Sequence, residues 1–308
     1  MLKATNPTRP TSLDELLDSQ LAARIARLDL ASRKIFFGKL QGERRSKKRG
    51  HSVEFADHRP YVAGDDLRHI DWNIYGRLDR LFMKLFMEEE DLSLHLVIDC
   101  SMSMDCGDPS KFLFAQRIAA ALGYIGLVNL NRVACTAIGR RDDTSILGSV
   151  RDLRGRRRMQ EFGQFLCGLR PEHQSDFRDA CRRIALTRRG KGVMIVLSDF
   201  LLKEGYEDGL RLLVGRGYDV FAMQVLSPQE IEPDLTGDLR LKDVEDLDLA
   251  DVTISAPLLK RYKATLAAYC DQLRLFCAAR EITHLTVRTD TPMDTLVLEY
   301  LRRRGVVR

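Results

Sequence analysis

Short apolar runs alternate along the chain with longer segments whose apolar residues recur at helical spacing. The runs Leu94–Ile98, Val133–Ile138 and Val193–Ser198 contain no Asp, Glu, Lys or Arg and have the length of buried strands. After Ser110, the apolar residues of segment 111–129 recur every three or four positions, which favours a helix with one apolar face. Strands that alternate with helices predict an open, mostly parallel sheet with helices on both faces.

The same patterns predict the other elements. Ser12 is placed to cap an N-terminal helix that runs to about Lys39, and Glu15 three residues later completes a capping-box pattern. Residues 42–52 are expected to form a basic loop. The other predicted strands are 81–87, 219–226 and 284–288, and the other predicted helices are 177–186, 208–214, 257–280 and 292–303.

The composition is that of a globular protein with a sizeable core. Of 308 residues, 44% are hydrophobic and 30% are charged, which excludes wholesale disorder. The longest uncharged apolar run, Ile118–Val128, has eleven residues, whereas a membrane span needs about 20. The first twenty residues contain acids and no apolar stretch typical of a secretory signal. The seven cysteines form no C-x-x-C pair, so we expect reduced thiols in a cytoplasmic protein without a membrane span.

Charge is distributed unevenly, although the net charge is only +5. Arg33–Arg49 contains eight basic residues and one acid, and Arg151–Arg158 contains five arginines, whereas Glu230–Asp251 contains nine acids and two bases. We interpret these segments mainly as solvated surface and linker. The basic segments have few interleaved aromatic residues, so a nucleic-acid or polyanion-binding function is the alternative and not the main hypothesis.

Side chains that could bind a ligand lie at the ends of two predicted strands, where sheets of this kind bind ligands. One strand runs into Asp99, Ser101 and Ser103 in a D-x-S-x-S pattern, and another runs into Asp199. Carboxylate and hydroxyl oxygens suit a hard cation, Mg²⁺ or alternatively Mn²⁺ or Ca²⁺. Asp and Ser also cap helices, but Ser110 already occupies the cap of the following helix. With only two carboxylates, the ion would keep an open position for an acidic side chain of a partner.

The D-x-S-x-S pattern resembles the metal-ion-dependent adhesion site of von Willebrand factor A-type domains, where a Thr and an Asp from two later loops complete the site. The resemblance implies a von Willebrand factor A-like, Rossmann-like sheet. Ser175, just ahead of the predicted helix 177–186, best matches the Thr position, with Ser in place of Thr, and Thr144 is the alternative. Ser175 or Asp176 could equally be a helix N-cap. The implied metal ligands are Asp99, Ser101, Ser103, Ser175 and Asp199.

A second motif lies upstream, between Arg59 and Trp72. It resembles the signature R-x-Y-x-x-G-D-D-x-R-x-I-D-W of the bacterial family called domain of unknown function 58, in which the signature precedes an A-type domain. The resemblance runs from about Ser52 to the end of the chain. The signature positions are Arg59, Tyr61, Gly64, Asp65, Asp66, Arg68, Asp71 and Trp72.

We expect the signature to have a structural role, with an interaction surface as the alternative. Its charged residues and Arg77 are dense enough for a closed ion-pair network around a turn at Gly64. Trp72, the only tryptophan, is expected to anchor the segment on the core. The predicted division of the chain is a basic helical segment 1–51, the signature region 52–92, a von Willebrand factor A-like core 93–228, and a C-terminal acidic loop with an α/β extension, 229–308, that completes the same domain.

These observations favour a metal-dependent protein-interaction module and disfavour an enzyme. The sequence contains no G-x-S-x-G elbow, no phosphate-binding G-x-x-x-x-G-K-[ST] loop and no G-x-G-x-x-G fingerprint. The family resemblance further implies a MoxR-type AAA+ ATPase as partner, with a role as adaptor in chaperone-like assembly or maturation.

Overall fold

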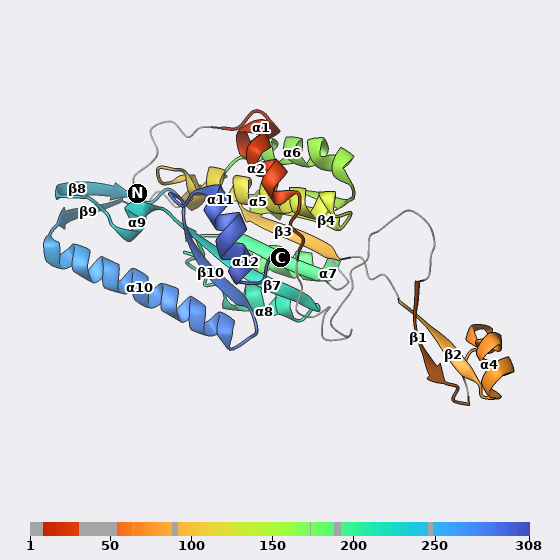
Figure 1. Cartoon of the computed structure of the whole chain (residues 1–308). Helices are drawn as coiled ribbons and strands as arrows, with labels where there is room; N and C mark the ends of the chain where they lie inside the picture. The colour runs from red at the N-terminus through yellow and green to blue at the C-terminus, as the bar shows by residue number, and fades with distance from the viewer. Residues whose placement is uncertain are drawn as a thin grey trace. The chain divides into compact units, whose positions relative to one another are not determined.

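The computed structural model describes residues 9–30, 54–63, 65–87, 92–172, 174–187, 192–245 and 249–308. The chain forms two compact units. The larger unit consists of Met1–Gln41 and Leu92–Arg308, and the smaller unit consists of Gly42–Asp91. Each unit is described by itself below (Figure 1).

A six-stranded sheet is the centre of the larger unit. Its strand order is β10-β7-β6-β3-β4-β5, and every neighbouring pair is parallel except β4 and β5. Strands β6 and β7 are buried along their whole length, which explains their continuous apolar sequences. The fold is therefore mixed α/β with a mostly parallel sheet, as the sequence predicts. The strands are β3 (Ser93–Asp99), β4 (Arg132–Arg141), β5 (Thr144–Leu153), β6 (Gly192–Ser198), β7 (Tyr218–Leu226) and β10 (Thr283–Arg288).

The direction in which the chain adds strands reverses in the middle of this sheet. From β3 the chain first adds β4 and β5 on one side, and then returns to add β6, β7 and β10 on the other. Strands β3 and β6 are neighbours across this reversal. In open α/β sheets, the carboxyl ends of two such strands diverge into separate loops and leave room for a ligand.

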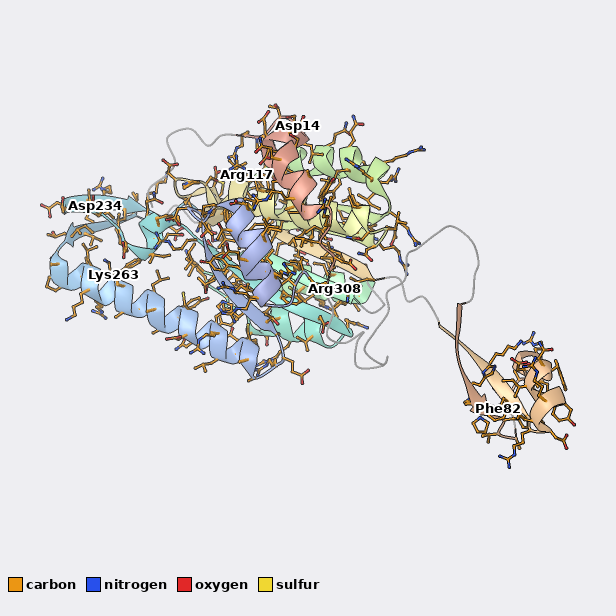
Figure 2. The ribbon with its side chains drawn as sticks, in the orientation of Figure 1. Asp14, Phe82, Arg117, Asp234, Lys263 and Arg308 are labelled. Atoms are coloured by element: carbon orange, nitrogen blue, oxygen red, sulfur yellow. The ribbon has the colours of Figure 1, made fainter. Side chains whose placement is uncertain are left out.

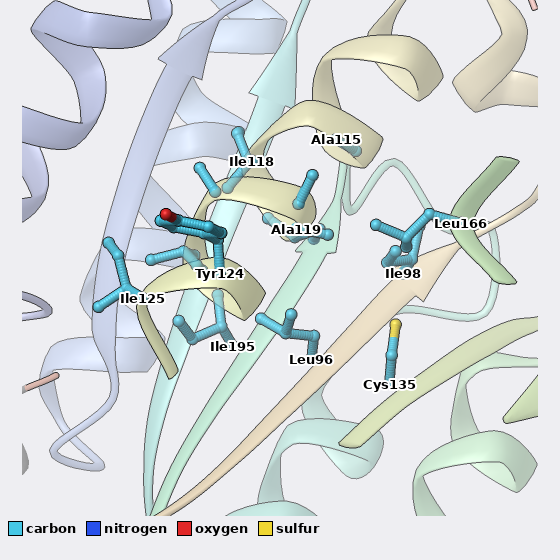
Figure 3. Packing of buried hydrophobic residues seen from close by; sticks show 14 of the residues in the cluster. Leu96, Ile98, Ala115, Ile118, Ala119, Tyr124, Ile125, Cys135, Leu166 and Ile195 are labelled. Carbon is cyan, nitrogen blue, oxygen red and sulfur yellow. The ribbon is translucent and has the colours of Figure 1, made fainter. Parts of the chain in front are cut away.

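Helices cover both faces of the sheet and bury two separate apolar clusters. One face carries α1, α2, α5, α6 and the C-terminal helical segment, and the other carries α7, α8 and the end of α10. Figure 3 shows Ala119 of α5 on the side of the helix that faces Leu96 of β3. The helices are α1 (Leu13–Leu16), α2 (Ser19–Ile25), α5 (Lys111–Val128), α6 (Met159–Gly168), α7 (Phe177–Thr187), α8 (Glu207–Val214), α9 (Pro228–Ile231), α10 (Ala256–Ala278), α11 (Met293–Thr295) and α12 (Leu301–Arg303).

Helix α5 is buried on nearly every side, whereas the sequence predicts a single apolar face. The reason is that α1, α2 and α6 pack over the side of α5 that faces away from the sheet. Among the described residues, α5 is the one helix long and apolar enough to cross a membrane, and 83% of it is buried inside the fold. A central core helix passes the same test of length and composition.

The predicted N-terminal helix is two short helices. Leu17 is extended, and the Asp18 side chain accepts a hydrogen bond from the backbone N–H of Leu21, which starts α2. Ser12 is the N-cap of α1, as predicted, but the capping box is wrong. The Ser12 hydroxyl donates to the Glu15 carboxylate and caps no backbone N–H. The rest of this predicted helix, residues 31–39, and the predicted loop 42–52 lie outside the described residues.

Several elements were not predicted. They include β5, which contains the first arginine of Arg151–Arg158, α6, which follows this cluster, and the antiparallel hairpin of β8 (Gly237–Lys242) and β9 (Leu249–Ile254). The hairpin lies in the segment expected to be an acidic loop. The C-terminal helix is interrupted by a π-helical turn, η4 (Leu296–Tyr300), and the short 3₁₀ helices of the larger unit are η2 (Met102–Asp105) and η3 (Arg156–Arg158).

The smaller unit is an antiparallel strand pair with two short helical segments. Strand β1 (Glu54–Pro60) pairs with β2 (Phe82–Met87), and an isolated bridge between Ile70 and Met83 fastens the connecting segment to β2. That segment contains η1 (Leu67–His69) and α4 (Trp72–Leu78).

Candidate metal centre

Two aspartates meet at the point where the strand order reverses. Asp99 is the last residue of β3, and Asp199 directly follows β6. Their strands are paired up to Ile98 and Leu197, and both side chains are buried, with 0% and 1% of the residue exposed. Burial, followed by the charge of Asp199, raises the pKa of Asp99 to about 6, against hydrogen bonds that lower it. The two carboxylates therefore lie within electrostatic reach of each other.

The D-x-S-x-S loop directs its oxygens to one place. One Asp99 oxygen accepts a hydrogen bond from the Ser101 backbone N–H at 3.0 Å, and the other accepts from the Ser198 hydroxyl at 2.7 Å. The Ser101 and Ser103 hydroxyls are 2.9 Å apart. Each Asp99 oxygen has a second lone pair, so these bonds orient the carboxylate and leave it able to bind a cation.

A buried lysine lies beside Asp199. The Lys111 ammonium donates to Asp199 at 2.7 Å and to Glu230 at 2.5 Å, and its side chain is 0% exposed. Burial lowers the pKa of Lys111, but the charges of Asp199 and Glu230 outweigh this effect and raise it above its ordinary value. The second Asp199 oxygen accepts from the Leu201 backbone N–H at 3.0 Å.

Neither Lys111 nor Glu230 was singled out from the sequence. The sequence contains only a weak indication that these two residues belong to the site. Lys111 is the first residue of α5, and a cation at a helix N-terminus is unfavourable unless an acid compensates for it. The sequence does not show that the acid comes from Glu230, 119 positions later.

Ser175 lies in the loop before α7, and this loop touches the D-x-S-x-S loop. The backbone N–H of Glu172 donates to the Cys100 carbonyl at 2.7 Å. The Ser175 hydroxyl oxygen is buried, and no hydrogen-bond partner is present for it among the described residues. A buried hydroxyl without a partner is what an absent ligand would leave. Thr144, the alternative, is on the edge strand β5, and its hydroxyl bonds to the backbone of Ile146.

A third carboxylate, which the sequence did not suggest, reaches the same place. Glu245, from the segment between β8 and β9, lies near enough to the Ser103 side chain to interact with it. Burial raises the pKa of Glu245, the charges of Asp199 and Asp99 add to this effect, and the Ser103 hydroxyl opposes it. Glu245 lines a hollow of about 330 Å³ together with Arg140, Asp142 and Gln174.

The chemistry of these side chains fits a hard divalent cation. All the candidate donors are carboxylate or hydroxyl oxygens, the ligands that Mg²⁺, Mn²⁺ and Ca²⁺ prefer. Among the described residues, no three His, Cys, Asp or Glu side chains are already arranged around a point that could hold a metal. An ion at this edge of the sheet therefore depends on the hydroxyls of Ser101, Ser103 and Ser175 as well as on carboxylates.

Ion pairs and hydrogen bonds link charged residues of the upstream signature to their neighbours. Arg59 binds Asp65 through two hydrogen bonds of 2.7 and 2.6 Å, and Arg68 binds Asp66. Asp71 accepts from the backbone at the start of α4 and lies 2.9 Å from His58. In the described part of the signature these bonds fasten local turns, and a closed network that joins all of these residues stays a prediction.

Within its own unit, Trp72 is 62% exposed and packs edge-to-face on Tyr75, its neighbour on α4. Its anchoring on the core of the larger unit stays a prediction. Tyr61 extends the pairing of β1 through its backbone N–H, which donates to the Leu81 carbonyl. Gly64 lies outside the described residues.

The basic clusters give little support to the polyanion hypothesis. Arg33–Arg49 lies outside the described residues. In the second cluster, Arg156 lies over the Tyr124 ring at 6.0 Å and Arg158 pairs with Glu161 at 3.0 Å. These two arginines already have contacts within the fold.

Comparisons with known proteins identify relatives over the whole chain. The model of the family described as "Protein of unknown function DUF58" matches residues 57–270. The "Uncharacterized protein Rv1480" of Mycobacterium tuberculosis and the "Uncharacterized protein Mb1516" of Mycobacterium bovis are each 26% identical over 323 aligned positions, which cover 99% of this chain and 98% of the relative. The "Uncharacterized protein MAV169" of Mycobacterium avium is 30% identical over 42% of this chain and 75% of its own length.

Two solved structures resemble parts of the fold. The conserved hypothetical protein BatB from Bacteroides thetaiotaomicron is 12% identical with a TM-score of 0.41, over 70% of this chain and 98% of that chain. The pilus adhesin SpaC from Lactobacillus rhamnosus GG is 11% identical with a TM-score of 0.42, over 71% of this chain and 30% of that chain.

Proposed function

This chain belongs to the DUF58 family, whose function is unknown, and we propose that it is a non-enzymatic, metal-dependent protein-interaction module. One observation carries the proposal. Asp99 and Asp199 meet, buried, where the strand order reverses, with the hydroxyls of Ser101 and Ser103 beside them. A concentration of negative charge in a buried place is costly unless a cation compensates for it. Lys111 compensates for Asp199, but among the described residues no ion pair reaches Asp99.

Five side chains are proposed to hold the cation. Asp99 and Asp199 supply the charge, and the hydroxyls of Ser101, Ser103 and Ser175 supply neutral oxygens. A divalent ion, Mg²⁺ or alternatively Mn²⁺ or Ca²⁺, takes six or more oxygen ligands, so five side chains would leave an open coordination position that an acidic side chain of a partner could fill. Bonds from Ser198 and the Ser101 backbone already fix the Asp99 carboxylate, so little further ordering is required when the ion binds.

The surroundings of Asp99 suit a metal ligand better than a catalytic nucleophile. A carboxylate that attacks a substrate must approach it, whereas Asp99 is fully buried and each of its oxygens accepts a hydrogen bond. His95, the histidine nearest in sequence, is buried within the sheet and lies 2.9 Å from the Thr136 hydroxyl. We therefore favour binding over catalysis.

The proposed partner is a MoxR-type AAA+ ATPase, with this chain as its adaptor in chaperone-like assembly or maturation. The partner comes from the family resemblance of the D-x-S-x-S motif and the upstream signature. The partner is proposed to present an acidic side chain because a hard cation with an open coordination position prefers a carboxylate oxygen as its further ligand.

The test is association with a MoxR-type AAA+ ATPase from the same genome, in Mg²⁺ and in EDTA. We expect association in Mg²⁺ only, and we expect Asp99→Ala to abolish it while leaving the circular dichroism spectrum unchanged. Asp234→Asn, which removes an exposed acid, is the matched control and should associate normally. Association of equal strength in EDTA, or unfolding caused by Asp99→Ala, would show that the proposed metal bridge is wrong.

A further inference from the structure

A buried lysine lies at the candidate metal centre and is not one of the proposed ligands. Lys111 is the first residue of α5, and its side chain is 0% exposed. Burial of an ammonium group is costly, and the positive end of the helix dipole makes this position still less favourable. Two acids compensate for the cost, Asp199 at 2.7 Å and Glu230 at 2.5 Å. Because Asp199 is also a proposed metal ligand, Lys111 and the ion would share one carboxylate.

Both oxygens of the Asp199 carboxylate already have partners. The Oδ2 atom accepts from the Lys111 ammonium, and the Oδ1 atom accepts from the Leu201 backbone N–H at 3.0 Å. The backbone carbonyl of Asp199 also accepts from the Gln224 side chain at 3.1 Å, which holds the residue in place. A divalent cation bound to Asp199 would therefore lie close to the buried ammonium, and the two positive charges would repel each other. Asp99 has no ion pair among the described residues, so the repulsion acts through Asp199.

Glu230 is placed to keep the ammonium when an ion takes the other acid. Its Oε2 atom accepts from the Ser227 backbone N–H at 2.8 Å and from the Ser227 hydroxyl at 3.1 Å, within the capping box of α9. This arrangement leaves Oε1 for Lys111. The start of α9 is itself fastened to the loop before α5, because the Gln229 side chain exchanges two hydrogen bonds with the Asp108 backbone. Glu230 is therefore held beside Lys111 by contacts that do not involve the metal centre.

We propose that Lys111 competes with the metal ion for Asp199, and that Glu230 retains the lysine when the ion binds. The inference rests on the proposed metal site and adds what sets its affinity. In the metal-free protein, the ammonium neutralises Asp199 and takes the place of part of the ion's charge. Because the lysine weakens binding of the ion alone, the ion is held best when a partner carboxylate binds to it at the same time.

Binding of Mn²⁺ alone to the full chain tests the competition, with free Mn²⁺ measured by electron paramagnetic resonance. Lys111→Met removes the competing charge and keeps most of the apolar side chain. We expect it to bind Mn²⁺ at least about tenfold more tightly, the smallest effect that a unit charge in contact has on proton binding by a carboxylate. A lysine that only held the fold together would give weaker binding, because its loss would disorder the ligands. The control is Lys263→Met, on exposed α10 surface, which should bind like the wild type (Figure 2).

Glu230→Gln tests the other half of the proposal and should have the opposite effect. Gln keeps the size of the side chain and can serve in the capping box of α9, but it leaves the ammonium to Asp199 alone. We expect Mn²⁺ to bind about tenfold more weakly, by the same reasoning. Glu232→Gln, which removes an exposed acid two positions later, is the matched control and should bind like the wild type. If Lys111→Met does not fold, the double variant Lys111→Met/Glu230→Gln replaces it and should bind Mn²⁺ more tightly than Glu230→Gln.

The outcomes separate this inference from the proposed function. Mn²⁺ binding that is lost in Asp99→Ala but is equal in the wild type, Lys111→Met and Glu230→Gln would overturn the competition and leave the metal site standing. Weaker binding by folded Lys111→Met, or binding by Glu230→Gln as tight as that of the wild type, would also overturn the competition. Binding that Asp99→Ala does not weaken, or no binding by the wild type and the Lys111 variants, would overturn both.

Discussion

At the scale of single residues, the candidate centre combines ligands that a motif reveals with partners that only the fold brings in. Asp99, Ser101 and Ser103 are recognisable because the spacing of the motif places them in one loop. Lys111 and Glu245 reach the centre from a helix and a hairpin that are distant in sequence. Pairing over such distances depends on how the elements pack, and no local pattern contains that information.

The raised pKa of Asp99 makes stability depend on pH in a defined direction. The pKa is about 6 in the fold and 3.8 for an ordinary aspartate, so the folded state binds protons more tightly. The stabilisation is fully present below pH 3.8 and is lost as the pH rises through 6. Above that range, the buried charge costs about 3 kcal/mol when no metal is bound.

We therefore expect Asp99→Asn to stabilise the metal-free protein at pH 8. Removal of the charge gains about 3 kcal/mol, and the loss of one hydrogen-bond acceptor costs about 1 kcal/mol. Urea unfolding in EDTA should show a net gain near 2 kcal/mol at pH 8 and no gain at pH 4. In saturating Mn²⁺ the wild type should become the more stable protein, because the ion binds only when Asp99 is charged. A variant less stable than the wild type at pH 8 in EDTA would contradict this prediction.

Lys111 should be essential for stability whether or not metal is present. Lys111→Met leaves the buried Asp199 and the partly buried Glu230 without their counter-ion, a change that costs about 3–5 kcal/mol for a buried pair. Lys263→Met, on the exposed side of α10 (Figure 2), should change stability by less than about 0.5 kcal/mol. Thermal unfolding of both variants is the measurement. Equal stability of Lys111→Met and the wild type would show that another group compensates for the two acids.

At the scale of secondary-structure elements, the sequence predicts what strong periodicity reveals. Strands β3, β6 and β7 are apolar on both faces, so their runs are unmistakable. Strand β5 is at the edge of the sheet, where many of its side chains are partly exposed, and its charged end obscures the pattern. Hairpin β8–β9 has no buried side chain in its described strands, so its charges resemble those of a loop.

The pairing of β3 with β6 positions both aspartates, and Gly192 lies opposite Ser93 in this pairing. A Cβ atom at Gly192 would lie 2.1 Å from the Ser93 carbonyl oxygen, so the backbone would have to move. We expect Gly192→Ala to destabilise the fold by at least about 1–3 kcal/mol, the usual cost of overpacking. It should also weaken Mn²⁺ binding, since the strand ends shift.

Gly168 provides the matched control for this prediction. It is the last residue of α6, and no atom lies within 4 Å of the place where its Cβ would be. Gly168→Ala should therefore be neutral or slightly stabilising in the same urea titration. Similar destabilisation by the two substitutions would contradict the claim that contact with Ser93 is the cause.

At the scale of the whole molecule, the sheet and the candidate centre belong to one unit and the upstream signature to the other. All six strands of the sheet lie in the larger unit. The N-terminal helical segment of this unit is also paired with its C-terminal residues. The backbones of Asp29 and Arg308 exchange two hydrogen bonds of 3.1 and 2.9 Å. The sequence predicts the mostly parallel sheet apart from its edge strand β5, but it cannot predict this closure, which joins residues 279 positions apart.

The larger unit should therefore fold and bind metal without the smaller one. We expect replacement of residues 42–91 by a flexible Gly/Ser linker of about ten residues to preserve a single cooperative unfolding transition. Mn²⁺ affinity should stay within about twofold of the wild type, because independent sites contribute additively. If the signature is an interaction surface, association with the AAA+ partner in Mg²⁺ should be lost even though metal binding persists. If it only stabilises the fold, the replacement should instead broaden or lower the unfolding transition. The exposed Trp72 and Tyr75 favour the first outcome, and the double variant Trp72→Ala/Tyr75→Ala in the full chain should reproduce it.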